Sequence, residues 1–194
     1  MESWRDYLTA LSAGLTALAV TAGDGTELAP AEAFRQWVDL THVVHTGGQN
    51  VYIVGNGGSA MIAGHMAADA CKNGGLRALA FNDAAFLTAT SNDLAFEEVF
   101  AVPLMRHGRA GDLLITISSS GNSPNILRAL DVARSLSMRT VTLSGKGADN
   151  RSRTLGDLNF YVPSPRYGWV ESAHQVVIHY WLDQYMDRYG QGAQ

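Results

Sequence analysis

The sequence is short of several features, and each shortage excludes a class of protein. It has one cysteine, Cys71, in 194 residues, so neither a disulfide framework within the chain nor a cysteine-rich zinc module can form. Only 16% of the residues are charged and the net charge is −4, which argues against a nucleic-acid partner. No apolar run approaches the roughly 20 residues of a membrane helix, and no basic segment precedes the apolar start. We therefore expect no membrane span, no signal peptide and a reducing, cytoplasmic location.

Two helical patterns open the chain. Residues 2–22 carry leucines at steps of three and four, which form one apolar stripe: Leu8, Leu11, Leu15 and Leu18. A second pattern begins at Pro30, which suits a first helical turn because it has no N–H to leave unpaired, and ends at Gly47-Gly48. Gly23-Asp24-Gly25 breaks the pattern between them. We expect a helical hairpin over residues 1–47, ahead of the main fold.

From residue 51 short apolar runs alternate with helical stretches. We predict a last helix at about 169–189 and strands at 51–54, 78–81, 113–117, 140–143 and 158–162. The strands are apolar along both faces, which is typical of a parallel sheet covered on both sides. The predicted fold class is α/β, with a five-stranded parallel sheet flanked by helices, in a single domain over 1–194 whose α/β sandwich spans 51–189. Ligands of such sheets bind in loops beyond the carboxyl ends of the strands.

A serine-rich loop after the third predicted strand holds the clearest chemical signal. It presents four hydroxyls, from Ser118, Ser119, Ser120 and Ser123. Pro124 fits the first position of the next helix, so Ser123 is the expected N-cap residue. The free N–H groups and the positive end of that helix, together with the hydroxyls, suit a phosphate dianion without Lys or Arg. An ordinary capped turn needs Ser123 alone, so we favour a phosphate site.

A glycine-rich loop, Gly55-Asn56-Gly57-Gly58-Ser59-Ala60, follows the first predicted strand. It partly matches the G-x-G-x-x-G/A fingerprint of dinucleotide-binding folds. That interpretation needs an acidic residue about 20 residues further on, and Asp83 comes late for it. Two other interpretations stay open: the glycines permit a sharp turn, or they let the backbone approach a sugar whose hydroxyls bond to Asn56. We expect no nucleotide cofactor.

Histidines and carboxylates gather at two places. His65 has Asp69 one helical turn away, a spacing that suits metal chelation, proton relay or a simple hydrogen bond. The last predicted helix carries Glu171 and His179, about 12 Å apart along its axis. One metal ion would struggle to reach both from one straight helix. Either Glu171 lies at a frayed helix start, or the ligands come from two chains at a subunit interface.

Together these residues resemble the sugar isomerase (SIS) domain family, and within it most closely the phosphoheptose isomerases. The matching pieces are Gly55-Asn56-Gly57-Gly58-Ser59 with His65, then Asn92-Asp93, the loop 118–123, and the C-terminal helix from Glu171 to His179. The resemblance covers nearly the whole chain. It implies a three-layer, flavodoxin- or Rossmann-like fold, and homotetramers with active sites at subunit interfaces, which would relieve the problem of reach.

The resemblance also implies roles for particular residues. The serine loop would hold the phosphate of a small phosphorylated sugar through Ser118, Ser119, Ser120 and Ser123. The sugar would be lined by Asn56, Gly57, Gly58, Asn92 and Asp93. One Zn²⁺ per site would be bound by His65 and His179. Asp69 and Glu171 would occupy the two remaining metal and catalytic positions.

Two positions depart from the family pattern, which usually has glutamate where this chain has Asp69 and glutamine where it has Glu171. Asp69 is one methylene shorter, so its reach to a substrate carbon changes, and Glu171 adds a negative charge. Two carboxylates and two neutral histidines would balance Zn²⁺. The general base is therefore either Asp69 or Glu171, and His179 is the expected acid.

The expected activity is aldose–ketose isomerisation of a phosphorylated sugar through an enediol(ate). The leading reaction converts sedoheptulose 7-phosphate to D-glycero-D-manno-heptose 7-phosphate. Two alternatives stay open: isomerisation of another sugar phosphate, and a non-catalytic phosphosugar sensor or adaptor, as in a family branch that associates with the bacterial replication initiator. Such adaptors tend to lack the metal and catalytic side chains. This chain keeps ionisable, metal-competent residues at all four positions, which favours an enzyme.

Overall fold

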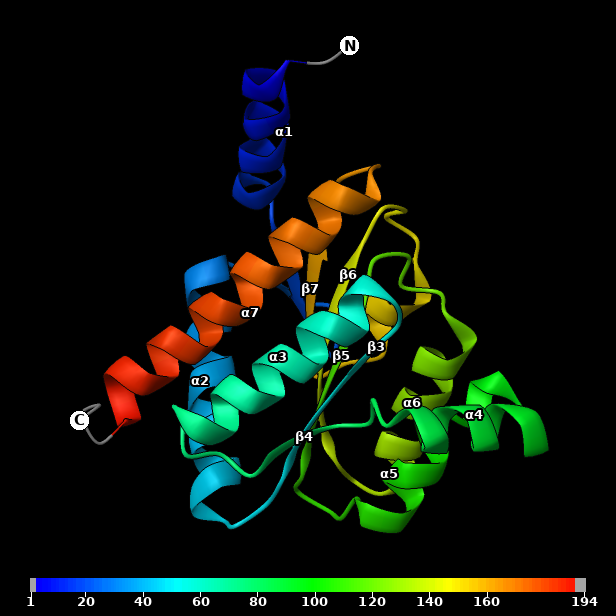
Figure 1. Ribbon diagram of the computed structural model, residues 1–194. Helices are drawn as coiled ribbons and strands as arrows, with labels where there is room; N and C mark the ends of the chain where they lie inside the picture. Colours follow the sequence, from blue (N-terminus) through cyan, green and yellow to red (C-terminus); the bar gives the residue numbers. More distant parts are fainter. Residues whose placement is uncertain (1–2, 191–194) are drawn as a thin grey trace.

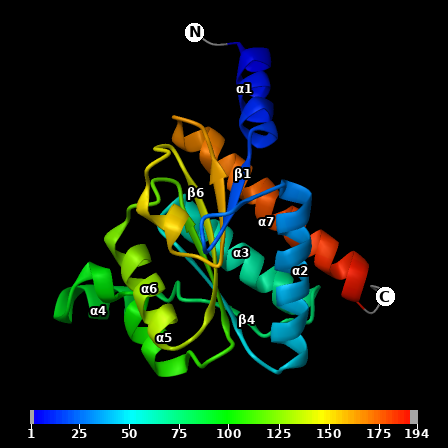
Figure 2. The ribbon, with the colours of Figure 1, turned by 180° about the vertical axis from the view of Figure 1, so that it is seen from behind.

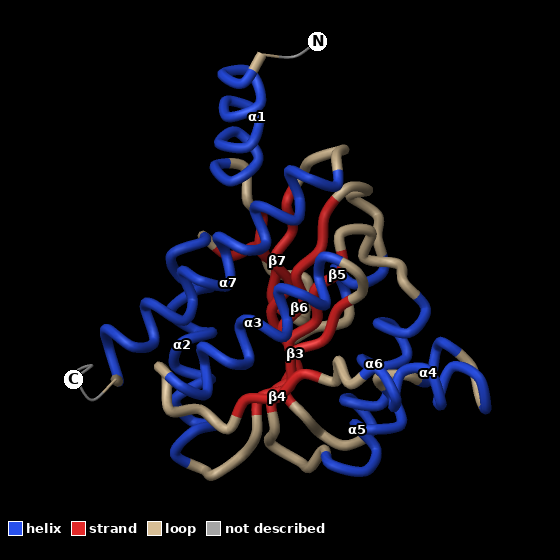
Figure 3. The backbone as a smooth tube through the Cα atoms, viewed as in Figure 1, coloured by secondary structure: helices blue, strands red, loops and turns tan. Residues whose placement is uncertain are grey.

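Five parallel strands form the centre of the sheet in the computed structural model, which describes residues 3–190. They are β3 (Val51–Gly55), β4 (Ala78–Ala80), β5 (Leu113–Ser118), β6 (Arg139–Gly145) and β7 (Leu158–Val162). They run in the order β7-β6-β5-β3-β4, and each coincides with a predicted strand. Every residue of β3, β5 and β7 is buried, because helices cover both faces of the sheet (Figure 3).

The whole sheet has seven strands, so the predicted number of five was wrong. β1 (Ala19–Ala22) and β2 (Glu27–Leu28) form a hairpin that adds to β7 in the antiparallel direction, with Val20 opposite Phe160. Gly23-Asp24-Gly25, predicted as a break between two helices, makes the turn, and Gly25 has a φ of +87°. The residues of the short β1 fit a helical pattern in the sequence. They form a strand because pairing with β7, which lies far along the chain, outweighs local propensity.

Helices form a layer on each face of the sheet. One face carries α2 (Pro30–Thr46), α3 (Gly58–Lys72) and α7 (Tyr167–Tyr189) (Figures 1 and 2). The other carries α5 (Ala101–His107), α6 (Pro124–Ser135) and the 3-10 helices η1 (Phe96–Glu98) and η2 (Arg151–Thr154), with α4 (Ala84–Asp93) outside them. α1 (Trp4–Thr16) projects from the body near the start of α7 (Figure 1). Within residues 3–190 we find no helix with both the length and the apolar character of a membrane span.

An aromatic cluster joins α2, α7 and β7 in the core. Trp37 stacks on Trp181 with 4.8 Å between ring centroids, and its ring lies 5.0 Å from that of Phe160. Trp181 Nε1 donates a hydrogen bond to Thr41 Oγ1 at 2.9 Å, so the indole N–H is satisfied although the ring is fully buried. Such aromatic pairs contribute about 0.5–1.5 kcal/mol each beyond simple burial. The cluster fixes α7, the helix of the predicted acid and metal ligands, against the sheet.

The sheet topology brings the two predicted loops to one edge. β3 and β5 are parallel neighbours, with Gly55 opposite Ile117 at their carboxyl ends. The glycine loop and the serine loop therefore leave the sheet side by side. α3 begins within the glycine loop, at Gly58, and packs beside α7 (Figure 1).

Candidate active site

The serine loop joins β5 to α6 and brings three hydroxyls together. Ser123 Oγ lies 3.4 Å from Ser118 Oγ and 3.5 Å from Ser120 Oγ, and Ser119 in the same loop is buried. Ser123 occupies the N-cap position of α6 with Pro124 in its first turn, as predicted, but the Ser123 hydroxyl makes no capping hydrogen bond. This hydroxyl is therefore available to an anion at the positive end of the helix.

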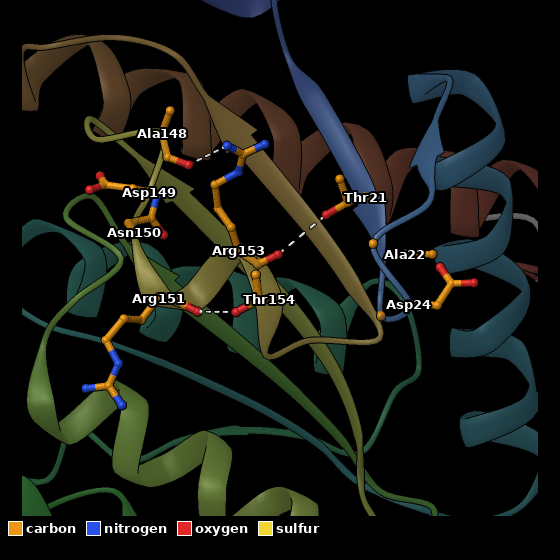
Figure 4. Close-up of a pocket in the computed structure, with 11 residues that line it drawn as sticks. Thr21, Ala22, Asp24, Ala148, Asp149, Asn150, Arg151, Arg153 and Thr154 are labelled. Carbon is orange, nitrogen blue, oxygen red and sulfur yellow. Dashed lines mark hydrogen bonds between the residues drawn. The ribbon is translucent and has the colours of Figure 1, made fainter.

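The segment after β6 packs against the serine loop and is hydrogen-bonded to it. Gly121 has a φ of +63°, and a Cβ there would clash with the side chain of Asn150, so only glycine fits. Ser152 N donates a hydrogen bond to Gly121 O at 3.0 Å. The same segment lines a separate cavity of about 510 Å³, shared with Thr21 and Asp24 of the β1–β2 hairpin (Figure 4). The described residues that line this cavity include none of the predicted site residues.

Asn56 ties the glycine loop to the first turn of α6. Its side-chain amide exchanges two hydrogen bonds with the amide of Asn125, at 2.8 and 2.9 Å, and Asn125 is fully buried. Each amide keeps one further N–H and one lone pair for another partner. The backbone then turns at Gly57, where a φ of +54° favours glycine. The glycine and serine loops therefore form one connected unit.

Asn92 and Asp93 lie apart from this unit, at the end of α4. Asn92 Nδ2 donates to Asp93 Oδ1 at 2.8 Å, and both residues are exposed. Among the hydrogen bonds of residues 3–190, none joins either residue to the two loops. Within the described residues of one chain, this predicted pair is therefore not hydrogen-bonded to the rest of the site.

Three predicted metal ligands converge where α3 and α7 lie side by side. His65, Asp69 and His179 each offer one ligand atom, and these atoms lie within 4.8 Å of one another. His65 Nε2 lies 3.3 Å from Asp69 Oδ2, and the rings of His65 and His179 are 5.3 Å apart. Two imidazole nitrogens and one carboxylate oxygen are a donor set of the kind found in catalytic zinc sites, which keep an open fourth position. The residues present therefore fit a zinc ion.

Glu171 lies outside this cluster but close to it. Its carboxylate lies against Gly58. A second cavity, of about 590 Å³, is lined by residues that include Gly58, His65, Glu171 and Gln175. Metal ligands from two chains are not needed, because three candidate ligands meet within one chain and Glu171 is not among them. Glu171 is instead free to face a molecule in the cavity.

His174, on the same helix, belongs to the core and not to the site. It is fully buried, and its Nε2 lies 3.0 Å from Ser144 O of β6. Burial lowers the pKa of His174 to about 4, so the ring is neutral at physiological pH. Its proximity to Glu171 in the sequence is therefore a poor guide to its role.

Two residues of this region, Asn125 and Gln175, were not predicted from the sequence. Asn125 follows Pro124 on a helix whose next residues are apolar, so a polar residue at a buried position was the available signal. Gln175 has its side-chain Nε2 2.9 Å from His179 Nδ1. Glutamine four residues before a histidine is not a known metal motif, and nothing in the sequence singled it out.

The chain is similar to known proteins over most of its length. The SIS domain family matches residues 25–145. The phosphoheptose isomerase of Helicobacter pylori (strain ATCC 700392 / 26695) is 37% identical over 158 residues, which cover 78% of this chain and 82% of that protein. Solved structures are similar too, among them two phosphoheptose isomerases. Phosphoheptose isomerase GmhA from Neisseria gonorrhoeae has 33% identity and a TM-score of 0.76, covering 80% of this chain and 86% of that one. A phosphoheptose isomerase from Francisella tularensis has 26% identity and a TM-score of 0.82, covering 95% and 96%.

Proposed function

This chain belongs to the SIS-domain family, and we propose that it is a phosphoheptose isomerase that interconverts sedoheptulose 7-phosphate and D-glycero-D-manno-heptose 7-phosphate. The observation that carries the proposal is the convergence of His65, Asp69 and His179 next to a carboxylate-lined cavity. A sensor or adaptor has no chemical need for such a cluster. The similarity to named phosphoheptose isomerases supports the choice of substrate.

The serine loop binds the phosphate group in this proposal. The hydroxyls of Ser118 and Ser120, each within 3.5 Å of Ser123 Oγ, the Ser123 hydroxyl itself and the positive end of α6 provide donors for a dianion, without a cationic side chain. Asn56, Gly57 and Gly58, joined to that loop through Asn125, line the sugar. Asn92 and Asp93 keep their proposed role in sugar binding only if α4, or another copy of the chain, brings them to the cavity.

The sugar carbons lie between the glycine loop and α7. Glu171, which faces the cavity, removes the proton from the carbon next to the carbonyl, and His179 supplies a proton to the enediol(ate). We assign the base to Glu171 and not to Asp69, because Asp69 lies 3.3 Å from His65 Nε2 and belongs to the metal-competent cluster. Glu171 has no such partner in that cluster.

His65, Asp69 and His179 hold a divalent metal in this proposal, and zinc suits their donor set best. A bound zinc ion would polarise the substrate carbonyl as a Lewis acid. The chain's own contribution is to fix three ligands on two packed helices, so that the cavity beside Glu171 stays open to the sugar.

The assembly and location remain part of the proposal. We propose a homotetramer in the cytoplasm, as the family resemblance implies. Large apolar side chains on α1 support an assembly of several chains, because Trp4 is 73% exposed and Leu8 44% exposed on a helix that projects from the body (Figure 1).

Proton exchange in D₂O tests the function directly. The protein is incubated with sedoheptulose 7-phosphate, with and without added Zn²⁺, and followed by NMR. We expect an aldoheptose phosphate that has gained deuterium at the carbon next to the carbonyl, and a rate that falls when a chelator removes the metal. Exchange with only a pentose or hexose phosphate would identify a different isomerase. Binding without exchange for every sugar phosphate would favour the sensor or adaptor.

A further inference from the structure

The side-chain amide of Gln175 contacts one ring nitrogen of His179. The two residues lie one turn apart on α7, and Gln175 Nε2 is 2.9 Å from His179 Nδ1. Met66 Sδ lies 3.9 Å from the same Nε2, on the side of α3, so the amide is held between two helices. Both Gln175 and His179 are half-buried. The contact therefore lies beside the metal-competent cluster and partly out of bulk water.

This contact decides which nitrogen of His179 is left for chemistry. A neutral imidazole has one nitrogen that donates and one that accepts. With the amide N–H of Gln175 donating to Nδ1, the ring proton must be on Nε2. Because Nδ1 is in contact with Gln175, Nε2 is the nitrogen left for another partner. In this arrangement His179 can donate a proton but has no lone pair at Nε2 for a metal ion.

We propose that Gln175 is a positioning residue whose amide selects the tautomer of His179. With its N–H end toward the ring, it keeps the proton on Nε2 and makes His179 a proton donor. Rotated by half a turn, its carbonyl oxygen accepts from Nδ1–H and leaves the Nε2 lone pair free for a metal. Partners behind a metal-ligating histidine are known to fix its tautomer in this way.

A glutamine suits this task because its side chain has both a donor end and an acceptor end. A glutamate at position 175 would only accept, and a methionine would do neither. The proposal rests on the proposed function, because that function asks His179 both to supply a proton and to bind a metal. By rotating its amide, Gln175 would let His179 supply a proton or bind a metal while the His179 side chain keeps its rotamer.

The first test reads the tautomer in the metal-free, full-length protein. ¹⁵N NMR of the imidazole nitrogens is recorded at about pH 8.5, well above the usual histidine pKa of about 6.5. The His179 signals are identified by their loss in His179→Gln. We expect the protonated nitrogen to be Nε2 in the wild type and Nδ1 in Gln175→Glu, with a mixture in Gln175→Met. The proposal is overturned if the wild type and Gln175→Glu show the same tautomer.

The second test measures Zn²⁺ affinity by competition with a chromophoric chelator. We expect Gln175→Glu to bind Zn²⁺ about tenfold more tightly than the wild type, since it holds Nε2 ready as a ligand. Val176→Glu adds the same charge at the neighbouring, exposed position and serves as the control. If Zn²⁺ affinity rises equally in the two variants, the added charge alone explains the rise and the proposal is overturned.

These readouts separate this proposal from the proposed function. A tautomer that follows residue 175 in a protein without isomerase activity would support the positioning role and refute the function. An active isomerase whose His179 tautomer ignores residue 175 would do the reverse.

Discussion

The Glu171 carboxylate lies directly against Gly58, with Oε2 3.0 Å from the position that a Cβ on Gly58 would occupy. Gly58 is the first residue of α3, so the carboxylate meets the positive end of that helix. His65, two turns further along α3, lines the same cavity. The missing side chain at position 58 is thus what lets the proposed base lie beside the metal-competent cluster.

Gly58→Ala should therefore displace the proposed base without unfolding the protein. We expect kcat to fall at least about tenfold, because a misplaced catalytic group loses rate steeply, while thermal stability stays level or rises slightly. Gly14→Ala on α1 is the matched control, since its Cβ would make only an ordinary contact at 3.7 Å with Val162. An unchanged kcat in Gly58→Ala would contradict the placement of Glu171.

Glu171→Gln separates the two candidate bases. If Glu171 removes the proton, deuterium exchange should fall by about 10²–10⁴-fold, the usual contribution of a general base. Adding Asp69→Glu to this variant restores both residues that are usual in the family, and we expect it to recover part of the exchange. Full activity in Glu171→Gln alone would assign the base to Asp69.

Asn125→Ala should weaken both the fold and substrate binding. It removes two hydrogen bonds and leaves the Asn56 amide without its partner, so we expect a loss of about 1–3 kcal/mol in the free energy of unfolding. KM for the sugar phosphate should rise, because the glycine and serine loops are no longer joined. Urea denaturation and steady-state kinetics measure the two effects. Asn122→Ala, which removes the exposed acceptor of one hydrogen bond donated by Arg151 N, should cost much less.

His174 should make the protein less stable in acid. Burial lowers its pKa to about 4 from an ordinary value of 6.5, so below pH 6.5 the unfolded chain binds a proton that the folded protein does not. The stabilising contribution is complete above pH 6.5 and is lost as the pH falls toward 4, by about 3 kcal/mol. Urea denaturation of the wild type and His174→Gln between these pH values measures it. Parallel stability profiles for the two proteins would contradict this account.

The sequence predicted the central sheet well because its strands are apolar on both faces. Leu113-Leu114-Ile115-Thr116-Ile117 can be recognised without tertiary information, and it forms most of β5. β1 carries no such signal: Ala19-Val20-Thr21-Ala22 becomes a strand only by pairing with β7. α4 was missed for a similar reason, since its small and polar residues form no clear apolar stripe.

The residues of the site also divide into those with a local sequence signal and those that depend on tertiary packing. His65 and Asp69 are neighbours on one helix, so their spacing predicted the contact. The approach of His179 depends on the packing of α7 against α3, which residue spacing alone does not contain, and here the family resemblance supplied the answer. Gln175 and Asn125 act through partners that only the folded chain brings near, so neither could be found from its local sequence.

The pairing of Val20 with Phe160 also bears on how the chain is made. β1 is synthesised well before β7, so it has to wait for its partner strand. Until then the β1–β2 hairpin has no sheet to join, and two short strands alone are at best marginally stable in water. The edge of the sheet made by β1 and β2 should therefore form late, with the slow closure that distant pairings impose.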